Sequence, residues 1–160
     1  MTVLCSELLS ALTGKTLVTA ESCTGGGIGA ALTAVPGSSE VYKGGIISYT
    51  NWVKEHFLHV DGKLLDTVGA VSGPVAEAMA KGARQALEAD IAVSVTGLAG
   101  PGGDHFGNPV GTVFIGYSDE ERTLSREYHF PGHREQVRAA AVEAAVRLAL
   151  EMQRRENAGK

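Results

Sequence analysis

The segment that most constrains the fold is Ile91–Val95 (IAVSV), which is almost uniformly apolar and rich in β-branched residues. A strand of this composition is covered on both of its faces, as the inner strands of layered α/β proteins are. A helix is predicted before it, because apolar residues recur at helical spacing from Ser72-Gly73-Pro74 to about Ala89. The sequence therefore predicts an α/β fold in which helices cover a central sheet.

The other periodic segments extend this pattern along the chain. Helices are expected at Val3–Leu12, at Gly27–Val35, from Asn51 as the cap through Phe57, and from Gly132 onward. Strands are expected at Thr16–Thr19, Val41–Tyr49, Val110–Tyr117 and Thr123–Phe130, and we expect 61–69 to be irregular and 153–160 to fray. The last two strands form an antiparallel hairpin, so the sheet is mixed. We expect a single three-layer α/β/α domain over residues 1–160, with a mixed, partly parallel sheet.

Composition narrows the classes of function. The 160 residues fit one domain of ordinary size. The net charge of −4 arises from 14 basic and 18 acidic residues that are intermixed, which disfavours nucleic acid and anionic membranes as partners. No run approaches the roughly 18 apolar residues of a membrane span, and the N-terminus lacks the pattern of a signal peptide. Cys5 and Cys23 have no paired spacing, so we expect a cytoplasmic protein.

Ser22 and Cys23 lie side by side in ESCTGG (21–26), where the first predicted strand gives way to a helix. The first backbone N–H groups of a helix lack intrahelical partners and attract an anion, or the oxyanion of an acyl-transfer intermediate. Ser22 is either a nucleophile or a helix N-cap, and by position alone capping is the commoner role. Cys23 is either a thiol nucleophile activated by the helix N-terminus or a small buried residue.

Two glycine-rich features remain to be interpreted. The loop 96–109 (TGLAGPGGDHFGNP) holds five glycines and two prolines between two predicted strands, and loops of this length are commonly functional or disordered. Gly25, Gly27 and Ala30 formally match a dinucleotide-binding pattern, but the acidic residue expected about 20 positions later is missing. The glycine-rich turn is also not followed by the Gly-Lys-Ser or Gly-Lys-Thr that ends a P-loop, so hydrolysis of a nucleoside triphosphate is disfavoured.

Charged and metal-ligating residues each have two interpretations. Lys54 is either a solvated helix lysine or a base whose pKa is lowered by the positive end of its own helix. Arg134 lies in the first turn of the closing helix, where the dipole disfavours it, so a contact with an anion would explain it; otherwise it is an exposed arginine. The potential ligands match no strong metal-site spacing: His56, His59 and Asp61.

Four segments, in the same order, resemble the CinA C-terminal domain family. They are ESCTGG (21–26), GGIISYTNWVKEHFL (44–58), VTGLAGPGGDHFGNPVGTVFIG (95–116) and FPGHREQVR (130–138). The resemblance covers nearly the whole chain, and four ordered motifs are more specific than any one of them. The family includes nicotinamide-mononucleotide deamidases, which occur as single domains or as the last domain of the competence/damage-inducible protein CinA. The resemblance favours a catalytic role for Ser22 over capping.

The resemblance implies an activity and roles for individual residues. The activity is hydrolysis of the carboxamide of nicotinamide mononucleotide to nicotinic acid mononucleotide and ammonia, in pyridine nucleotide recycling. Ser22 is implied as the nucleophile, Lys54 as the general base and Tyr49 as a proton-relay or orienting group, with no metal and no cofactor. Arg134 is expected to meet the phosphate, and the expected substrate-binding residues are Cys23, Thr24, Gly25, Gly26, Asn51, Thr96, Gly97, Gly100 and Arg134.

One departure and several alternatives stand beside this interpretation. Gly107-Asn108 occupies the place of an acidic residue and a lysine in the family pattern, and loss of that lysine would weaken substrate binding. The main alternative is a non-catalytic or weakly active module of the same family that binds a nucleotide or pyridine compound. A Cys23-dependent hydrolase and a flavin or nicotinamide oxidoreductase are further alternatives. The expected partners are a small nucleotide substrate and further copies of the chain, as a dimer or higher oligomer, without nucleic acid or membrane.

Overall fold

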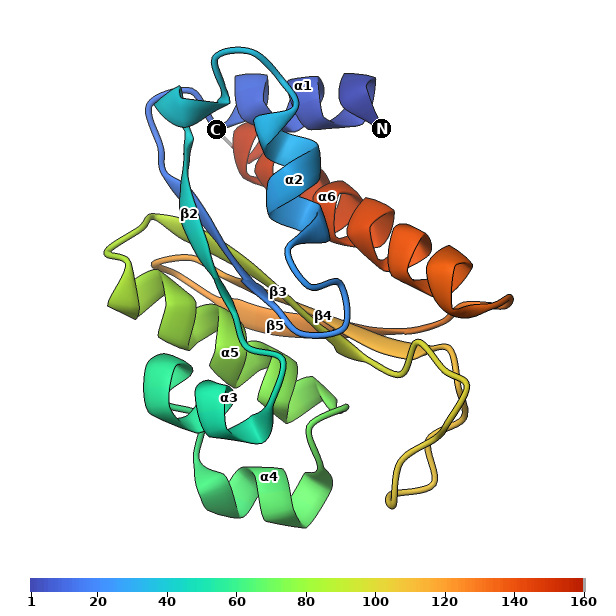
Figure 1. Cartoon of the computed structure of the whole chain (residues 1–160). Helices are drawn as coiled ribbons and strands as arrows, with labels where there is room; N and C mark the ends of the chain where they lie inside the picture. The colour runs from blue at the N-terminus through green and yellow to red at the C-terminus, as the bar shows by residue number, and fades with distance from the viewer. Residues whose placement is uncertain (160) are drawn as a thin grey trace.

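The computed structural model describes residues 1–159 and arranges them in three layers (Figure 1). A five-stranded sheet lies between α1, α2 and α6 on one face and α3, α4 and α5 on the other. In chain order the elements are α1 (Thr2–Ala11), β1 (Leu17–Glu21), α2 (Gly27–Thr33), the 3-10 helix η1 (Ser38–Glu40), β2 (Tyr42–Ile47), α3 (Asn51–Leu58), α4 (Gly62–Val68), α5 (Gly73–Ala86), β3 (Ile91–Gly97), β4 (Thr112–Ser118), β5 (Thr123–His129) and α6 (Arg134–Ala158).

The sheet has the order β2-β1-β3-β4-β5 and is mixed, as predicted. Strand β1 is parallel to both β2 and β3, whereas β4 is antiparallel to β3 and to β5. In this register Glu21, the last residue of β1, is paired with Ile47 of β2 and with Val95 of β3. The residues that follow these three therefore emerge at one edge of the sheet, where the carboxyl ends of its parallel strands meet.

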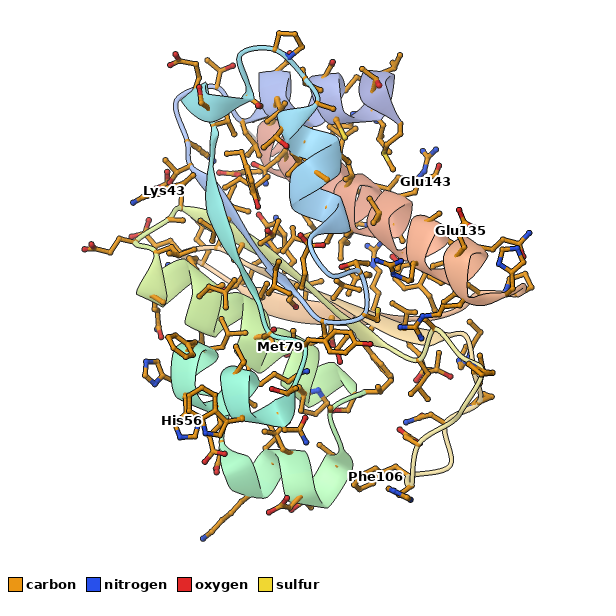
Figure 2. All side chains as sticks on the ribbon, viewed as in Figure 1. Lys43, His56, Met79, Phe106, Glu135 and Glu143 are labelled. Atoms are coloured by element: carbon orange, nitrogen blue, oxygen red, sulfur yellow. The ribbon has the colours of Figure 1, made fainter. Side chains whose placement is uncertain are left out.

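Each face of the sheet buries its own apolar cluster. The cluster under α1, α2 and α6 includes Leu8, Leu32 and Val146, and the cluster under α3, α4 and α5 includes Leu58 and Met79. Of these residues, Met79 is labelled in Figure 2. The inner strands β1 and β3 are buried almost throughout, which confirms the composition-based prediction of a strand covered on both faces. Within residues 1–159, no helix combines the length and the apolar character needed to cross a bilayer.

Three predictions of local structure are corrected. The segment 61–69, expected to be irregular, contains α4, whose N-cap Asp61 accepts a hydrogen bond from the backbone N–H of Lys63. Thr50 caps α3, and Asn51 is the first helical residue. The helix α6 continues to Ala158 instead of fraying from Gln153, because this side chain is buried and donates to the hydroxyl of Tyr117 at 2.9 Å. The predicted fraying of Lys160 lies outside the described residues.

Helices α3 and α5 approach closely at Gly82. A Cβ atom added to Gly82 would collide with the backbone carbonyl oxygen of Leu58, at the end of α3. Backbone atoms cannot rotate away as the end of a flexible side chain can, so this position accepts only glycine at the present helix spacing. The contact matters for function because α3 also bears Lys54.

Replacement of Gly82 by alanine is expected to lower the free energy of unfolding by about 1–3 kcal/mol. The clash outweighs the roughly 1 kcal/mol by which alanine favours a helix over glycine. Chemical denaturation measures the change. Gly102→Ala is the control, because a Cβ there meets no atom within 4 Å, and its free energy of unfolding should not fall. Equal or greater stability of Gly82→Ala would contradict the close approach of the two helices.

Candidate active site

The turn that contains Ser22 leaves the sheet between its two inner parallel strands. The backbone N–H of Ser22 donates to the carbonyl of Val95 at 3.0 Å, so the pairing of β1 with β3 continues to this residue. Gly25 and Gly26 then adopt positive φ angles of 58° and 105°, a region that glycine enters without strain, before α2 begins. Ser22 thus lies in a tight turn, as predicted, and the structure places this turn at the carboxyl edge of the sheet.

Glu21 occupies the N-terminus of α2. Its buried carboxylate accepts hydrogen bonds from the hydroxyl of Thr24 at 2.6 Å and from the backbone N–H groups of Ile28 and Gly29 at 2.8 and 3.0 Å. We predicted that the first N–H groups of this helix are available to an anion or oxyanion, and for Ile28 and Gly29 that prediction is wrong. The positive end of the helix is already matched by a carboxylate of the chain itself.

Lys54 reaches Ser22 from α3 and is only 1% exposed. Its Nζ atom lies 2.9 Å from Ser22 Oγ, 2.8 Å from the carbonyl oxygen of Ser48 and 3.5 Å from that of Tyr49. Burial lowers the pKa of the Lys54 amine to about 8, because the charged form is poorly solvated there. Near pH 8 and above, the neutral amine is therefore substantially populated.

The partners of Lys54 suit a neutral amine that acts as a base. A neutral amine has two N–H groups and one lone pair. With the N–H groups directed at the carbonyls of Ser48 and Tyr49, the lone pair is left for the hydroxyl proton of Ser22. The arrangement is that of a nucleophile hydrogen-bonded to its base, with the base oriented by further groups.

Cys23 is poorly suited to nucleophilic attack. Its side chain is buried, and burial raises the pKa of the thiol to about 11, although the charge of Lys54 acts in the opposite direction. The thiolate is the reactive form of cysteine, and it is scarce at neutral pH when the pKa is this high. The geometry therefore favours Ser22 over Cys23 as the reactive group.

A cavity of about 290 Å³ opens beside Ser22 and Lys54. It is bounded by the Ser22 turn, the start of α3, the α4–α5 connection, the loop after β3 and the start of α6. Among the described residues its charged lining groups are Lys54 and Arg134, and no carboxylate lines it. The lining residues are Ser22, Cys23, Tyr49, Asn51, Lys54, Ala70, Val71, Thr96, Gly97, Leu98, Ala99, Gly100, Gly102 and Arg134. A site with this charge favours an anionic ligand.

A larger cavity, of about 390 Å³, lies at the opposite end of the sheet. Most of its ionisable lining residues are acidic, among them Asp90, Asp119 and Glu120. The described residues that line it include no cysteine, histidine, serine or threonine, so it lacks the nucleophile–base pair found beside Ser22. We therefore take the cavity beside Ser22 and Lys54 as the candidate functional site.

Arg134 and Tyr49 are joined at the rim of the functional cavity. Arg134, the first residue of α6, donates from Nη1 to the carbonyl of Gly100 at 2.7 Å and from Nη2 to the hydroxyl of Tyr49 at 3.1 Å. Both residues are exposed. The hydroxyl of Tyr49 thus meets Arg134, while the backbone carbonyl of Tyr49 is the part that faces Lys54. The proton-relay or orienting role of Tyr49 stays a prediction.

Three residues predicted to bind substrate are not among the residues that line the cavity. Thr24, Gly25 and Gly26 form the turn after Ser22. Thr96 lines the cavity, but its hydroxyl donates to the carbonyl of Ala70. Asn108, which stands at the lysine position of the family pattern, donates to Asp104 at 2.7 Å and to the carbonyl of Val71 at 3.2 Å, so it ties the glycine-rich loop to the α4–α5 connection.

Sequence reasoning missed three contributors to the site. The carbonyl of Ser48 accepts a hydrogen bond from Lys54, and a backbone acceptor cannot be predicted from a pattern of side chains. Glu21 was recognised only as part of a motif, although an acidic residue a few positions before a helix is a signal for its N-terminus. Arg138 donates to the carbonyls of Cys23 and Thr24 from 115 and 114 residues away, a contact that local sequence does not reveal.

The fold and site together define an α/β protein whose mixed sheet holds a buried serine–lysine pair at the carboxyl edge of its parallel strands. The family model of the CinA C-terminal domain matches residues 2–153, and the chain belongs to this family. Membership confirms the resemblance stated from the four sequence motifs.

Named relatives and solved structures agree with this assignment. A CinA-like protein of Parasynechococcus marenigrum is 49% identical over 142 residues, which cover 89% of this chain and 33% of the relative. One from Mycobacterium tuberculosis is 46% identical and covers 86% of this chain and 32% of the relative. The chain therefore spans about a third of the length of these curated relatives.

Solved structures show the same fold over nearly the whole chain. The competence damage-inducible protein A (ComA) of Klebsiella pneumoniae superposes with a TM-score of 0.91 at 36% identity, covering 94% of each chain. The competence/damage inducible protein CihA of Agrobacterium tumefaciens gives a TM-score of 0.89 at 39% identity, also covering 94% of each chain.

The buried amine of Lys54 should make stability depend on pH. Its pKa is about 8 in the folded chain and about 10.5 in the unfolded chain, so between these values the unfolded chain binds more protons. The free energy of unfolding of the wild type should therefore rise relative to Lys54→Met as the pH increases from about 8 to about 10.5, by roughly 3 kcal/mol in all.

Urea denaturation over this pH range measures the difference between wild type and variant. Lys81→Met is the control, because Lys81 is exposed on α5, and its stability should run parallel to that of the wild type. A constant difference between the wild type and Lys54→Met would show that the amine keeps its ordinary pKa in the folded chain.

Proposed function

We propose that this chain is a serine amidohydrolase that hydrolyses the carboxamide of nicotinamide mononucleotide to nicotinic acid mononucleotide and ammonia. The observation that supports the proposal most is the 2.9 Å contact between Ser22 Oγ and the nearly unexposed amine of Lys54. A carboxamide is a poor electrophile, so hydrolysis requires a nucleophile that is deprotonated as it attacks. Membership of the CinA family supports the proposal, because the resemblance to this family implies the activity.

In the first step, Ser22 Oγ bonds to the carboxamide carbon while its proton passes to neutral Lys54. The carbonyl oxygen becomes an oxyanion, which needs donors at the position where the charge develops. The N–H groups of Ile28 and Gly29 are taken by Glu21. We therefore assign the oxyanion to the backbone N–H groups of the turn that directly follows Ser22, beginning with those of Cys23 and Thr24.

In the second step, the Lys54 ammonium returns its proton to the amide nitrogen as the carbon–nitrogen bond breaks, and ammonia leaves. The acyl group then remains on Ser22 Oγ. A water molecule attacks this ester with neutral Lys54 as the base, and the proton returns to Ser22 as nicotinic acid mononucleotide departs. One residue serves as base and acid in turn, which its pKa of about 8 permits near neutral pH.

The charges of the cavity support a substrate with a phosphate group. Lys54 is committed to the reacting atoms, so Arg134 is the charged side chain at the rim that is left for the phosphate. Its guanidinium is held by Gly100 and Tyr49, which orients it before any ligand arrives. A planar guanidinium with several N–H donors matches the oxygens of a phosphate.

Ammonia release from nicotinamide mononucleotide is the direct test. Ser22→Ala and Lys54→Met should each lower the rate of release by about a thousandfold or more, because both members of a nucleophile–base pair are needed. Cys23→Ala is the matched control beside Ser22 and should keep most of the activity. Loss of activity in Cys23→Ala, with activity kept in Ser22→Ala, would transfer the nucleophile to the thiol.

Measurements of binding and of product release on the wild type distinguish an enzyme from a binding module. A folded chain that binds nicotinamide mononucleotide in calorimetry, yet releases neither ammonia nor nicotinic acid mononucleotide, would reject the deamidase. The same result would favour the non-catalytic nucleotide-binding module.

The rate should increase with pH, because the base is the neutral form of Lys54. We expect kcat/KM to rise as the pH approaches about 8 and to level off above it, following the pKa of the amine. Steady-state kinetics in constant-ionic-strength buffers provide the profile. Lys54→Arg, which stays charged over the whole range, should be inactive throughout. A rate that falls as pH increases through 8 would contradict a neutral lysine base.

A further inference from the structure

Arg138 lies outside the cavity lining and binds the turn at residues 22–26, which we call the nucleophile turn. On α6, one helical turn after Arg134, its Nε donates to the carbonyl of Cys23 at 3.0 Å and its Nη2 to the carbonyl of Thr24 at 3.2 Å. One planar guanidinium therefore binds two successive peptide groups of the turn, Cys23–Thr24 and Thr24–Gly25. An ammonium on a flexible stem does not match this fork.

Glu21 binds other polar groups of the same turn and of the start of α2. Its carboxylate binds the hydroxyl of Thr24 at 2.6 Å and the N–H groups of Ile28 and Gly29. Carbonyl oxygens of the turn are thus bound by a guanidinium, while its hydroxyl and the N–H groups beyond it are bound by a carboxylate. Gly25, at a φ of 58°, lies between these two sets of contacts, and a Cβ there would lie 3.6 Å from Arg138 Nη2.

We propose that Arg138 is a positioning residue, which fixes the peptide planes after Ser22 and thereby aims Ser22 Oγ at Lys54 and the substrate. A trans peptide is planar, so binding the carbonyl of Cys23 also sets the direction of the Thr24 N–H, which the proposed function assigns to the oxyanion. The carbonyl of Thr24 accepts from the Gly27 N–H at 3.0 Å as well as from Arg138, and the Gly25 N–H donates to the carbonyl of Ser22 at 3.1 Å. This inference rests on the proposed function, because the turn then supplies both the nucleophile and the donors for the oxyanion. Displacements of about 1 Å at such a site reduce rates by up to about 100-fold.

The position of Arg138 argues against a role in stability alone. The residue is exposed, and its partners are two backbone carbonyls of a turn rather than apolar side chains of the core. Arg147 lies further along α6, is also exposed and pairs with Glu143 of the same helix. Arg147 therefore provides a matched control for the loss of an arginine from α6.

The experiment compares Arg138→Ala, Arg138→Lys and Arg147→Ala in the ammonia-release assay and in thermal unfolding. Arg138→Ala should lower kcat by about tenfold or more with a much smaller change in KM, because the turn orients the reacting atoms rather than binding the ground state. Arg138→Lys should recover only part of this loss, and Arg147→Ala should behave as the wild type. Millimolar guanidinium chloride should restore activity to Arg138→Ala, whereas methylammonium chloride should not.

Three results would overturn the proposal. The first is a kcat for Arg138→Ala within about twofold of the wild type. The second is an equal loss in Arg147→Ala, which would indicate a general effect on α6. The third is a loss of activity that follows a fall in unfolding temperature and is not reversed by guanidinium, which would indicate a merely structural role.

Hydrogen–deuterium exchange separates failure of this proposal from failure of the proposed function. If the wild type releases no ammonia, the deamidase assignment fails, and exchange at residues 22–26 then decides the role of Arg138. Faster exchange in Arg138→Ala, slowed again by guanidinium, would support the positioning role of Arg138 without reference to the reaction. Unchanged exchange in this segment would overturn it.

Discussion

The buried amine of Lys54 is the interaction on which the rest of the site depends. Removing an ammonium group from water is unfavourable unless other polar atoms replace the water. Around Lys54 Nζ these atoms are oxygens of Ser22, Ser48 and Tyr49. The same burial lowers the pKa to about 8, which turns a lysine into a usable base. These partners lie at the end of β2 and in the turn after β1, so the base exists only when both segments are in place.

The parallel part of the sheet brings these segments together. Strands β2, β1 and β3 run in the same direction and are in register at Ile47, Glu21 and Val95, so the residues after them meet at one edge. Helix α6 closes the edge from one side with two arginines, of which Arg134 faces the rim and Arg138 the nucleophile turn. Helix α3 closes it from the other side and is held against α5 at Gly82. Sheet order, rather than any single motif, therefore assembles the cavity.

Much of the fold could be predicted because it follows from patterns within short segments. The apolar composition of Ile91–Val95 predicted a strand covered on both faces, and Ser72-Gly73-Pro74 predicted the start of α5. The helix α4 was missed because seven residues form a marginal helix alone, and its packing against α5 and its Asp61 cap stabilise it. The continuation of α6 past Gln153 was missed because the bond to Tyr117 joins residues 36 positions apart.

The sequence by itself determined the layered α/β class, the turn at Ser22 and the candidacy of Lys54, because strand composition, helical spacing and motif order are local properties. Only the tertiary structure decided that Lys54 is buried against Ser22, that burial raises the pKa of the Cys23 thiol, and that Glu21 rather than a ligand occupies the start of α2. Each of these depends on which atoms exclude water from a group and which donors or acceptors replace it. That environment is formed by residues far apart in the chain, and the physical reason is that desolvation and hydrogen bonding act through space rather than along the sequence.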